Sequence, residues 1–534
     1  MLNRYGSYAA GIRSAEGWTV ERFTAPSGLY GASGLRIAPN GELVVVQHYG
    51  NQVSALDIDA GSVRTIVGKD GGLPAPDDLD YDSSGVMYVT QPQYDRVSVR
   101  YPDGTTKPIA DVPMANGIAI LRDRVFVNET VPGGRILEVF ADGSPPRTIT
   151  QGLMLANGHS FGPDDRLYWP EMVAGEIWRV DLDGGAPERF LGGLAMPTAV
   201  KFSPDGLLTA VCAGNGEVIQ TPLDSPAAHT IASMRPGQDN LVFGPAGRLF
   251  ITHFIDGGVS ELVGDGEERA LVDPGFLFPF ALTFGTDGTL YAADGMSLRA
   301  VDSNGDVDRA GTWLEEGFPG WIRSAAAGPD GTLFLTSSSG TVVSWDPVAH
   351  KAGAVLAEGL VEVVGSAWTP RSGLVLAEAG TGRVLRVDAN GAPVELTAEI
   401  DRPTGLAIYE GGCFVSDERT GSISMLDDTG GVRQLCSGFD RPQGLALTRG
   451  RLFVLDVGRQ ELVAVDPVGG GRTTVATGLP VGDPPGIDSP TLPGMAAIGL
   501  TGPLSAFVDV AVGPDGSLFI GADGEGAILR VRTA

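Results

Sequence analysis

Six polar residues recur at one position of a repeat in the first half of the chain. Each opens the first strand of its unit: Ser33, Asp77, Asn116, Asn157, Thr198 and Asp239. If the units close into a ring, these side chains point toward its central channel. Carboxylate and amide oxygens are the ligands of a hard divalent cation such as calcium, which takes about six to eight of them. The pattern therefore predicts a metal site, although channel positions that merely face water also tolerate polar residues.

A second repeat position, where the second strand of each unit ends, carries the candidate acid–base groups. In the first half it holds His48, Gln91, Glu129, Glu171, Cys212 and His253. In the second half it is mostly acidic, which is typical of a side chain that hydrogen-bonds the following turn. His48 and His253 belong to units that become neighbours on ring closure, and His159 follows Asn157 on the same strand. Because imidazole titrates near neutral pH, we interpret these three histidines as candidate general bases, with Glu129 and Glu171 orienting a histidine or binding the metal.

The elements that position these residues are short strands in a unit of about forty residues that recurs twelve times. Each unit has an apolar strand, a Pro-Asp-Gly-like turn and a second apolar strand, as in ALTFGTDGTLYAAD from Ala281. Repeats of this length and type are typical of β-propeller blades. The chain of 534 residues therefore predicts an all-β fold of two six-bladed β-propellers, twelve four-stranded blades in all.

The last blade has only three strands of its own, whereas a spare strand, Trp18–Ala25, precedes the first blade. Since an unpaired sheet edge is unfavourable, we expect the spare strand to complete the last blade. The predicted domains are residues 26–272, and residues 273–534 together with strand 18–25. A Pro/Gly-rich insertion at residues 478–505 is either a lid or binding loop, or a disordered excursion.

Composition narrows the class of partner. The formal net charge is −28, from 65 acidic and 37 basic residues, which argues against binding to nucleic acid or to anionic membrane surfaces.

Three cysteines imply no disulfide framework. The N-terminal segment has no continuous apolar stretch and no segment has the length of a membrane span, so we expect a cytoplasmic protein. Nothing in the sequence indicates the oligomeric state.

Three short motifs resemble those of six-bladed calcium hydrolases, the senescence-marker-protein/gluconolactonase family and the paraoxonases. They are ANGHSFGPDD from Ala156, MANGI from Met114, and DNL from Asp239 followed by LFITH from Leu249. The resemblance implies Asn116, Asn157 and Asp239 as ligands of a divalent metal, with Ca²⁺ as the expected ion and Asn240 as a further contact. Ser33 and Thr198 stand where these families have acidic residues, and Asp77 is the candidate to supply the missing charge.

The leading hypothesis is a metal-dependent hydrolase of a lactone or related cyclic ester, acting in the channel of the first propeller. Two alternatives stay open: a lyase or isomerase with a histidine base beside a metal-polarised carbonyl, and a non-enzymatic binding scaffold. The aromatic stretch Phe276–Phe284 and Trp169 suggest an apolar small-molecule substrate, although blade packing accounts for them equally well. We expect the second propeller to be structural or regulatory.

Overall fold

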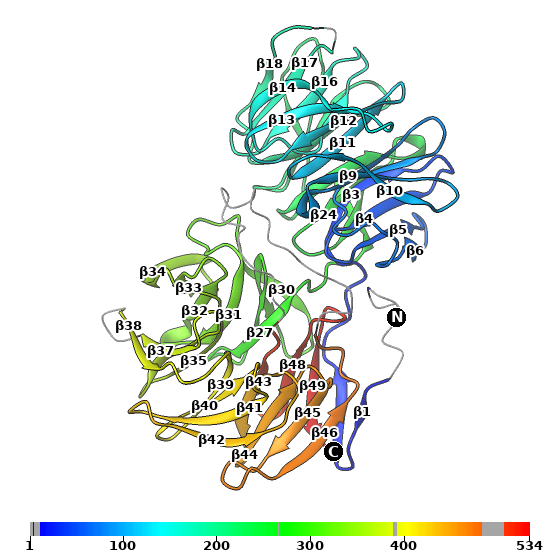
Figure 1. Ribbon diagram of the computed structural model, residues 1–534. Coiled ribbons are helices and arrows are strands. Elements are labelled where there is room, and N and C mark those ends of the chain that lie inside the picture. The colour runs from blue at the N-terminus through cyan, green and yellow to red at the C-terminus, as the bar shows by residue number, and fades with distance from the viewer. Residues whose placement is uncertain (1–3, 5–10, 183, 265, 388–391, 483–506) are drawn as a thin grey trace.

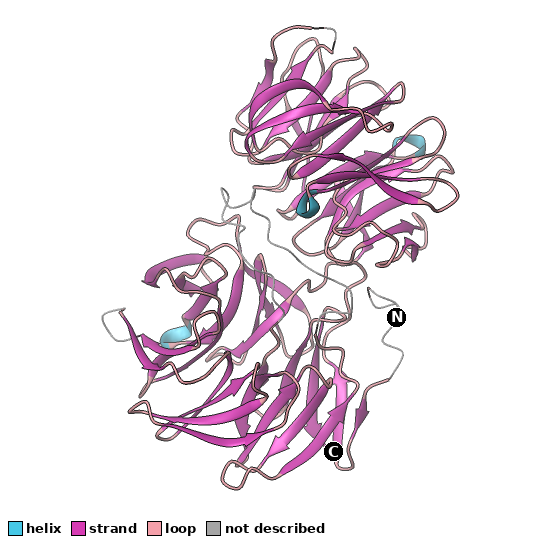
Figure 2. Cartoon of the chain, viewed as in Figure 1, coloured by secondary structure: helices cyan, strands magenta, loops and turns pink. Residues whose placement is uncertain are grey.

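The protein consists of two β-propellers, each built from six antiparallel sheets, as Figure 1 and Figure 2 show. The computed structural model describes residues 4, 11–182, 184–264, 266–387, 392–482 and 507–534. The predicted all-β fold of twelve blades is confirmed. Most of the predicted loop at 478–505 lies outside the described residues.

The six blades of the first propeller follow one another along the chain, and each has its strands in sequence order from the channel outward. Blades 1 to 3 comprise β3 (Ala32–Ile37), β4 (Leu43–Gln47), β5 (Gln52–Leu56) and β6 (Val63–Val67); β7 (Leu79–Tyr81), β8 (Met87–Gln91), β9 (Arg96–Arg100) and β10 (Thr106–Asp111); and β11 (Ala115–Leu121), β12 (Arg124–Glu129), β13 (Pro132–Val139) and β14 (Arg147–Met154). Blades 4 to 6 comprise β15 (Ser160–Phe161), β16 (Leu167–Glu171), β17 (Glu176–Val180) and β18 (Glu188–Gly192); β19 (Pro197–Phe202), β20 (Leu208–Cys212), β21 (Glu217–Thr221) and β22 (His229–Ser233); and β23 (Gln238–Phe243), β24 (Leu249–His253), β25 (Val259–Val263) and β26 (Glu267–Val272).

The second propeller begins at Pro279 and repeats the same arrangement. Blades 7 to 9 comprise β27 (Pro279–Phe284), β28 (Leu290–Asp294), β29 (Ser297–Val301) and β30 (Val307–Thr312); β31 (Ile322–Ala327), β32 (Leu333–Ser337), β33 (Val342–Asp346) and β34 (Lys351–Ala357); and β35 (Val363–Thr369), β36 (Gly373–Glu378), β37 (Arg383–Val387) and β38 (Pro393–Thr397). Blades 10 to 12 comprise β39 (Pro403–Tyr409), β40 (Gly412–Asp417), β41 (Ser422–Asp427) and β42 (Val432–Ser437); β43 (Pro442–Thr448), β44 (Arg451–Asp456), β45 (Glu461–Val465) and β46 (Arg472–Thr477); and β47 (Val510–Val512), β48 (Leu518–Ala522) and β49 (Ala527–Thr533) with β2 (Trp18–Arg22). Three short 3₁₀ turns, Pro92–Tyr94, Pro245–Gly247 and Pro329–Gly331, complete the described elements.

Burial along one blade explains why its strands are apolar without strict alternation. In blade 1 every residue of β4, LVVVQ, and of β5, QVSAL, is buried, because neighbouring blades cover both faces of the sheet. The outer strand β6 is largely exposed. Gly41, with a φ of +86°, makes the turn between β3 and β4, a conformation that glycine adopts without steric cost.

The two rings are closed differently. In the first, β23 and β24 of blade 6 pack against β3 of blade 1, and every blade uses only its own consecutive strands. In the second, β2 pairs antiparallel with β49, with Trp18 opposite Thr533 and Arg22 opposite Leu529. The prediction that the N-terminal strand completes the last blade is therefore confirmed. In addition, β1 (Arg13–Ser14) adds a fifth strand to blade 11, beside β46 (Figure 1).

An aromatic cluster joins the propellers. The ring centroid of Tyr49, from the first propeller, lies 4.8 Å from that of Phe278 and 6.0 Å from that of Trp321, both from the second. Tyr30 lies 5.2 Å from Phe278. The Arg4 guanidinium stacks over the Tyr30 ring at 3.7 Å and donates hydrogen bonds to the carbonyls of Phe276 and Leu277. The two rings are therefore held by a shared buried core rather than by a linker alone.

Candidate functional site

The channel of the first propeller presents two layers of side chains. We call Ser33, Asp77, Asn116, Asn157, Thr198 and Asp239 the mouth layer, and the residues three positions later the deep layer: Arg36, Asp80, Ala119, Ser160, Lys201 and Val242. Register shifts lie between the layers, for example between Ala32 and Leu35 in β3 and between Gln238 and Leu241 in β23. Because a β-bulge changes the alternation of a strand by one residue, both layers reach the channel.

Two carboxylates of the mouth layer meet at one hydroxyl. Ser33 Oγ lies 2.9 Å from Asp239 Oδ2 and 3.2 Å from Asp77 Oδ1. A serine hydroxyl has a single proton, so it donates to only one of them at a time. Burial, and then the charge of Asp77, raise the pKa of Asp239 well above its ordinary value, while the Ser33 hydroxyl opposes the shift. The pair is thus an electronegative site that a proton or a cation stabilises.

His48 and Tyr49 lie beside this pair of carboxylates. His48 Nδ1 is 3.2 Å from Asp77 Oδ1, but neither ring nitrogen of His48 has an aligned hydrogen bond. The Tyr49 hydroxyl is buried without a partner, and burial followed by the charges of Asp77 and Asp239 raises the pKa of Tyr49 well above its ordinary value. Gly31 permits the approach of the Tyr49 ring, since a Cβ at Gly31 would lie 3.1 Å from Tyr49 Cε2. Sequence reasoning missed Tyr49, although it directly follows a candidate base.

The uncharged members of the mouth layer differ in how far their oxygens are engaged. Asn116 Oδ1 is buried and has no hydrogen-bond partner among the described residues. Asn157 Oδ1 accepts the N–H of Gly158 at 2.7 Å, and its amide nitrogen contacts Met172 Sδ at 3.3 Å. Thr198 Oγ1 donates to the carbonyl of Gln238. Asn240 Oδ1 accepts the N–H of Leu241, so this amide caps its own strand.

This donor set fits a hard cation better than a transition metal. Asp77, Asp239 and the unpartnered Asn116 Oδ1 are oxygen donors, with Ser33 between the carboxylates. Within the described ranges, no group of three or more His, Cys, Asp or Glu side chains is placed to hold a metal ion. A cation here would therefore depend on amide and hydroxyl oxygens as well as on the two carboxylates.

The structure buries the other two predicted bases, His159 between blades 3 and 4 and His253 within blade 6. His159 is held between Asn128 Oδ1 and the carbonyl of Phe126, each 3.1 Å from a ring nitrogen, and burial lowers its pKa to about 3. His253 Nε2 lies 3.2 Å from Ser260 Oγ, and burial followed by the charge of Arg235 lowers its pKa to about 4. Neither imidazole is brought together with the mouth-layer carboxylates by a described contact. Both are neutral near pH 7.

Glu129 and Glu171 are engaged in local contacts. Glu129 forms a two-pronged ion pair with Arg135 of β13. Glu171 accepts the indole N–H of Trp169 at 2.9 Å and the N–H of Met154 at 2.7 Å, where the chain enters the blade. In the second propeller, Asp456 accepts the N–H groups of Asp440 and Arg441 at the equivalent place. Glu171 therefore performs the same turn-fixing role as the acidic residues of the second half.

Four charged side chains of the first channel escaped the sequence analysis. The Arg36 guanidinium lies 3.6 Å from Asp78 Oδ2 and 3.5 Å from Asp80 Oδ1, and donates to the carbonyl of Ile118 two blades away. Lys201 Nζ donates to the carbonyl of His159 at 3.3 Å. Burial, and then the charge of Arg36, lower the pKa of Lys201 to about 7. The available signal was a charged residue on an innermost strand where other blades have an apolar or small one.

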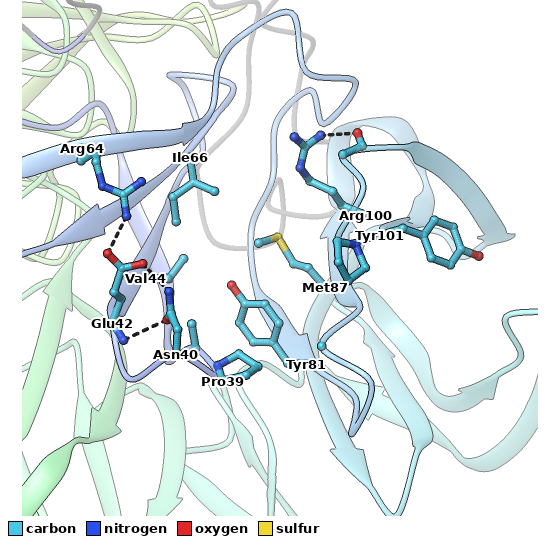
Figure 3. A pocket seen from close by; sticks show the side chains of 14 residues that line it. Pro39, Asn40, Glu42, Val44, Arg64, Ile66, Tyr81, Met87, Arg100 and Tyr101 are labelled. Atoms are coloured by element: carbon cyan, nitrogen blue, oxygen red, sulfur yellow. Dashed lines mark hydrogen bonds and ion pairs between the residues drawn. The ribbon is translucent and has the colours of Figure 1, made fainter.

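A cavity of the first propeller lies outside both channel layers. It has a volume of about 560 Å³ and lies between blades 1 and 2, where Tyr81, Met87 and Ile66 line it (Figure 3). The charged side chains that line it have partners in the protein: Arg64 pairs with Glu42, and Arg100 donates a hydrogen bond to the carbonyl of Gly104 at 2.8 Å. No mouth-layer residue lines this cavity.

Comparison with known proteins gives likenesses to solved six-bladed propellers. No family model matches the chain, and no curated protein matches it. A streptogramin B lyase structure aligns with a TM-score of 0.39 at 18% identity, covering 52% of this chain and 94% of the lyase. A gluconolactonase from Xanthomonas campestris aligns with a TM-score of 0.38 at 16% identity, covering 45% and 88%. Nidogen, from a nidogen/laminin complex, aligns with a TM-score of 0.35 at 19% identity, covering 41% and 90%. None of the three assigns an activity to this chain.

The described residues include no helix with the length and apolar character needed to span a membrane.

Proposed function

We propose that the first propeller is a divalent-cation-dependent hydrolase of a lactone or related cyclic ester. The observation that carries the proposal is the pair of carboxylates, Asp77 and Asp239, converging on the Ser33 hydroxyl beside the unpartnered Asn116 Oδ1. Burial and the charge of Asp77 raise the pKa of Asp239, and two carboxylates this close together favour a counter-cation; the donors are those that Ca²⁺ prefers.

Asp77, Asp239 and Asn116 would hold the cation, with Ser33, Asn157 and Thr198 as further oxygen donors of the same layer. When bound, such an ion supplies Lewis-acid polarisation of a carbonyl and a lowered pKa of water. The role of general base falls to His48, because His159 is hydrogen-bonded to blade 3 and His253 is hydrogen-bonded within blade 6. Asp77, 3.2 Å from His48 Nδ1, would orient the imidazole.

The surroundings favour a substrate with an apolar portion. Tyr49 and Phe254 pack around His48, with ring centroids 4.9 and 5.8 Å from the imidazole. Tyr49 also brings a buried hydroxyl to the two carboxylates. Of the aromatic residues named from the sequence, Phe278 belongs to this cluster through its contact with Tyr49, whereas Trp169 hydrogen-bonds Glu171 and packs between blades 3 and 4.

The test combines cation binding with turnover. Chelator-treated protein is titrated with Ca²⁺ by calorimetry and its melting temperature is measured, then a panel of aliphatic and aromatic lactones is assayed. A cation bound only by the folded state raises stability by about 2.7 kcal/mol at a hundredfold excess over its Kd. We expect this rise in the wild type and its loss in Asp239→Asn, together with at least a ~100-fold loss of activity.

Thr404→Ala, at the equivalent mouth position of the second propeller, is the matched control and keeps both properties. Turnover in ¹⁸O-water distinguishes hydrolysis, which incorporates the label, from elimination or isomerisation, which does not. Stabilisation by no divalent cation, or equal stabilisation of wild type and Asp239→Asn, would contradict the proposal and leave the scaffold alternative.

A further inference from the structure

A cavity lies in the channel of the second propeller, at the layer three positions after its mouth layer. Its volume is about 370 Å³, within the range of small-ligand sites. The deep layer of this propeller, defined as in the first, lines it: Thr283, Ala326, Ala367, Ala407, Ala446 and Ala511. Asp509 also lines it, and is the one titratable side chain among its lining residues in the described chain.

Asp509 stands at the repeat position that Asp78 holds in the first propeller. Each accepts the N–H of the next residue through Oδ1, Leu79 at 2.9 Å and Val510 at 2.8 Å. Each also requires a glycine in the preceding blade. A Cβ at Gly34 would lie 2.6 Å from Asp78 Cα, and a Cβ at Gly444 would lie 2.7 Å from Asp509 Cα. The two aspartates therefore have the same backbone setting.

Their remaining partners differ. Asp78 faces the Arg36 guanidinium at 3.6 Å and accepts the N–H of Ile118 at 3.2 Å. To compare the two rings, the blade of Asp509 is aligned with the blade of Asp78, and the other blades are counted from there. In the deep layer, Ala446 then takes the place of Arg36, Ala367 that of Lys201, and Ala511 that of Asp80. These substitutions remove both cations.

Asp509 consequently lacks an internal counter-charge. Within the described residues it forms no ion pair, and the Val510 N–H is its side-chain hydrogen bond. Burial raises its pKa to about 7, with that N–H as the opposing contact. Arg323, a basic mouth-layer residue of this channel, lies over the Phe280 ring at 4.6 Å and is absent from the cavity lining.

We propose that this cavity binds a small organic cation, a guanidinium or primary ammonium group on a short apolar body, paired with Asp509. The first propeller indicates the chemistry, because its own guanidinium and ammonium groups occupy the corresponding layer of the channel. The small side chains of the ring, five alanines and Thr283, leave the volume that an arginine or lysine side chain would otherwise fill. With a single carboxylate, the cavity is a poor site for a divalent metal, which requires several oxygen donors.

The test uses the full chain and calorimetric titration with methylguanidinium and n-propylammonium, with Na⁺ and tetramethylammonium as matched controls. We expect both N–H-bearing cations to bind and the controls to bind at least tenfold more weakly. Because the ligand pairs with ionised Asp509, its affinity should increase from pH 6 to pH 8. Asp509→Asn, which preserves shape, should weaken binding at least tenfold and remove the pH dependence.

Ala446→Arg places a guanidinium in the preceding blade, as Arg36 does in the first propeller, and should abolish binding by occupying the site. The isosteric Asp509→Asn variant keeps the test decisive if the larger arginine prevents folding. The proposal is overturned if neither organic cation binds, if Na⁺ binds equally well, or if Asp509→Asn binds as the wild type does. Affinity that falls with rising pH would also overturn it, since that indicates a ligand of the protonated acid.

Discussion

In the first propeller the mouth layer carries two carboxylates, and the side chains of Arg36 and Lys201 occupy the deep layer. The second propeller differs in both layers. There the mouth layer is filled by Phe280, Arg323, Val364, Thr404, Gln443 and Val508, each at most 2% exposed, and the deep layer is a cavity lined by alanines. The backbone repeat is the same. Two residues per blade, three positions apart, therefore decide which part of a propeller channel is polar and which part is hollow.

The largest effect is expected at the contact that holds the two different channels together. Tyr49→Ala removes a buried ring that packs on Phe278 and Trp321, and loss of a buried aromatic side chain costs about 3–5 kcal/mol. Chemical denaturation should show this loss. Tyr49→Phe should retain most of the stability, because the hydroxyl has no partner. A loss below about 1 kcal/mol in Tyr49→Ala would mean that the propellers are held elsewhere.

The next prediction concerns the pH dependence of the unfolding free energy, which has opposite signs for the two channels. The pKa of Asp509 is raised from 3.8 to about 7, so its contribution to stability is present below about pH 4 and is lost as pH rises toward 7. The pKa of Lys201 is lowered from 10.5 to about 7, so its contribution is present above about pH 10 and is lost as pH falls toward 7. At about 1.4 kcal/mol per pKa unit, each contribution amounts to at most about 4–5 kcal/mol.

Asp509→Asn should therefore flatten the stability curve between pH 4 and 7, and Lys201→Met should flatten it between pH 7 and 10. Unfolding free energies measured across both ranges test this. If both variants altered the same limb of the curve, the contrast between the two deep layers would be wrong.

A smaller effect, on Ca²⁺ affinity, is expected in the mouth layer of the first propeller. Ser33→Ala removes the hydroxyl between Asp77 and Asp239, and with it the contact that opposes the rise in the pKa of Asp239. The pKa of Asp239 should rise further, and Ca²⁺ affinity at pH 7 should fall by up to about tenfold, since a shift of one pKa unit is 1.36 kcal/mol. Titration at several pH values measures it. An unchanged pH profile would show that Ser33 does not hold the pair.

The repeat made the blades, their number and the swapped strand predictable, because turn chemistry and apolar runs recur at fixed spacing. The mouth layer was also found by aligning blades. Tyr49 was not, because its role depends on a contact with the other propeller. Lys201 and Arg36 were missed because register shifts in the innermost strands bring residues three apart to one side, against simple alternation. The direction of His159 and His253 depended on partners in neighbouring strands that no local pattern specifies.

The pairing of β2 with β49 makes the first propeller an insertion within the second. Residues at opposite ends of the sequence must meet before the second ring closes, which is a costly contact for an unfolded chain. Once folded, the first propeller brings its first and last blades together, because Ser33 and Asp239 are hydrogen-bonded. This shortens the loop that the second ring has to close. We therefore expect the ring with the carboxylate pair to form first, and the other ring to close after it.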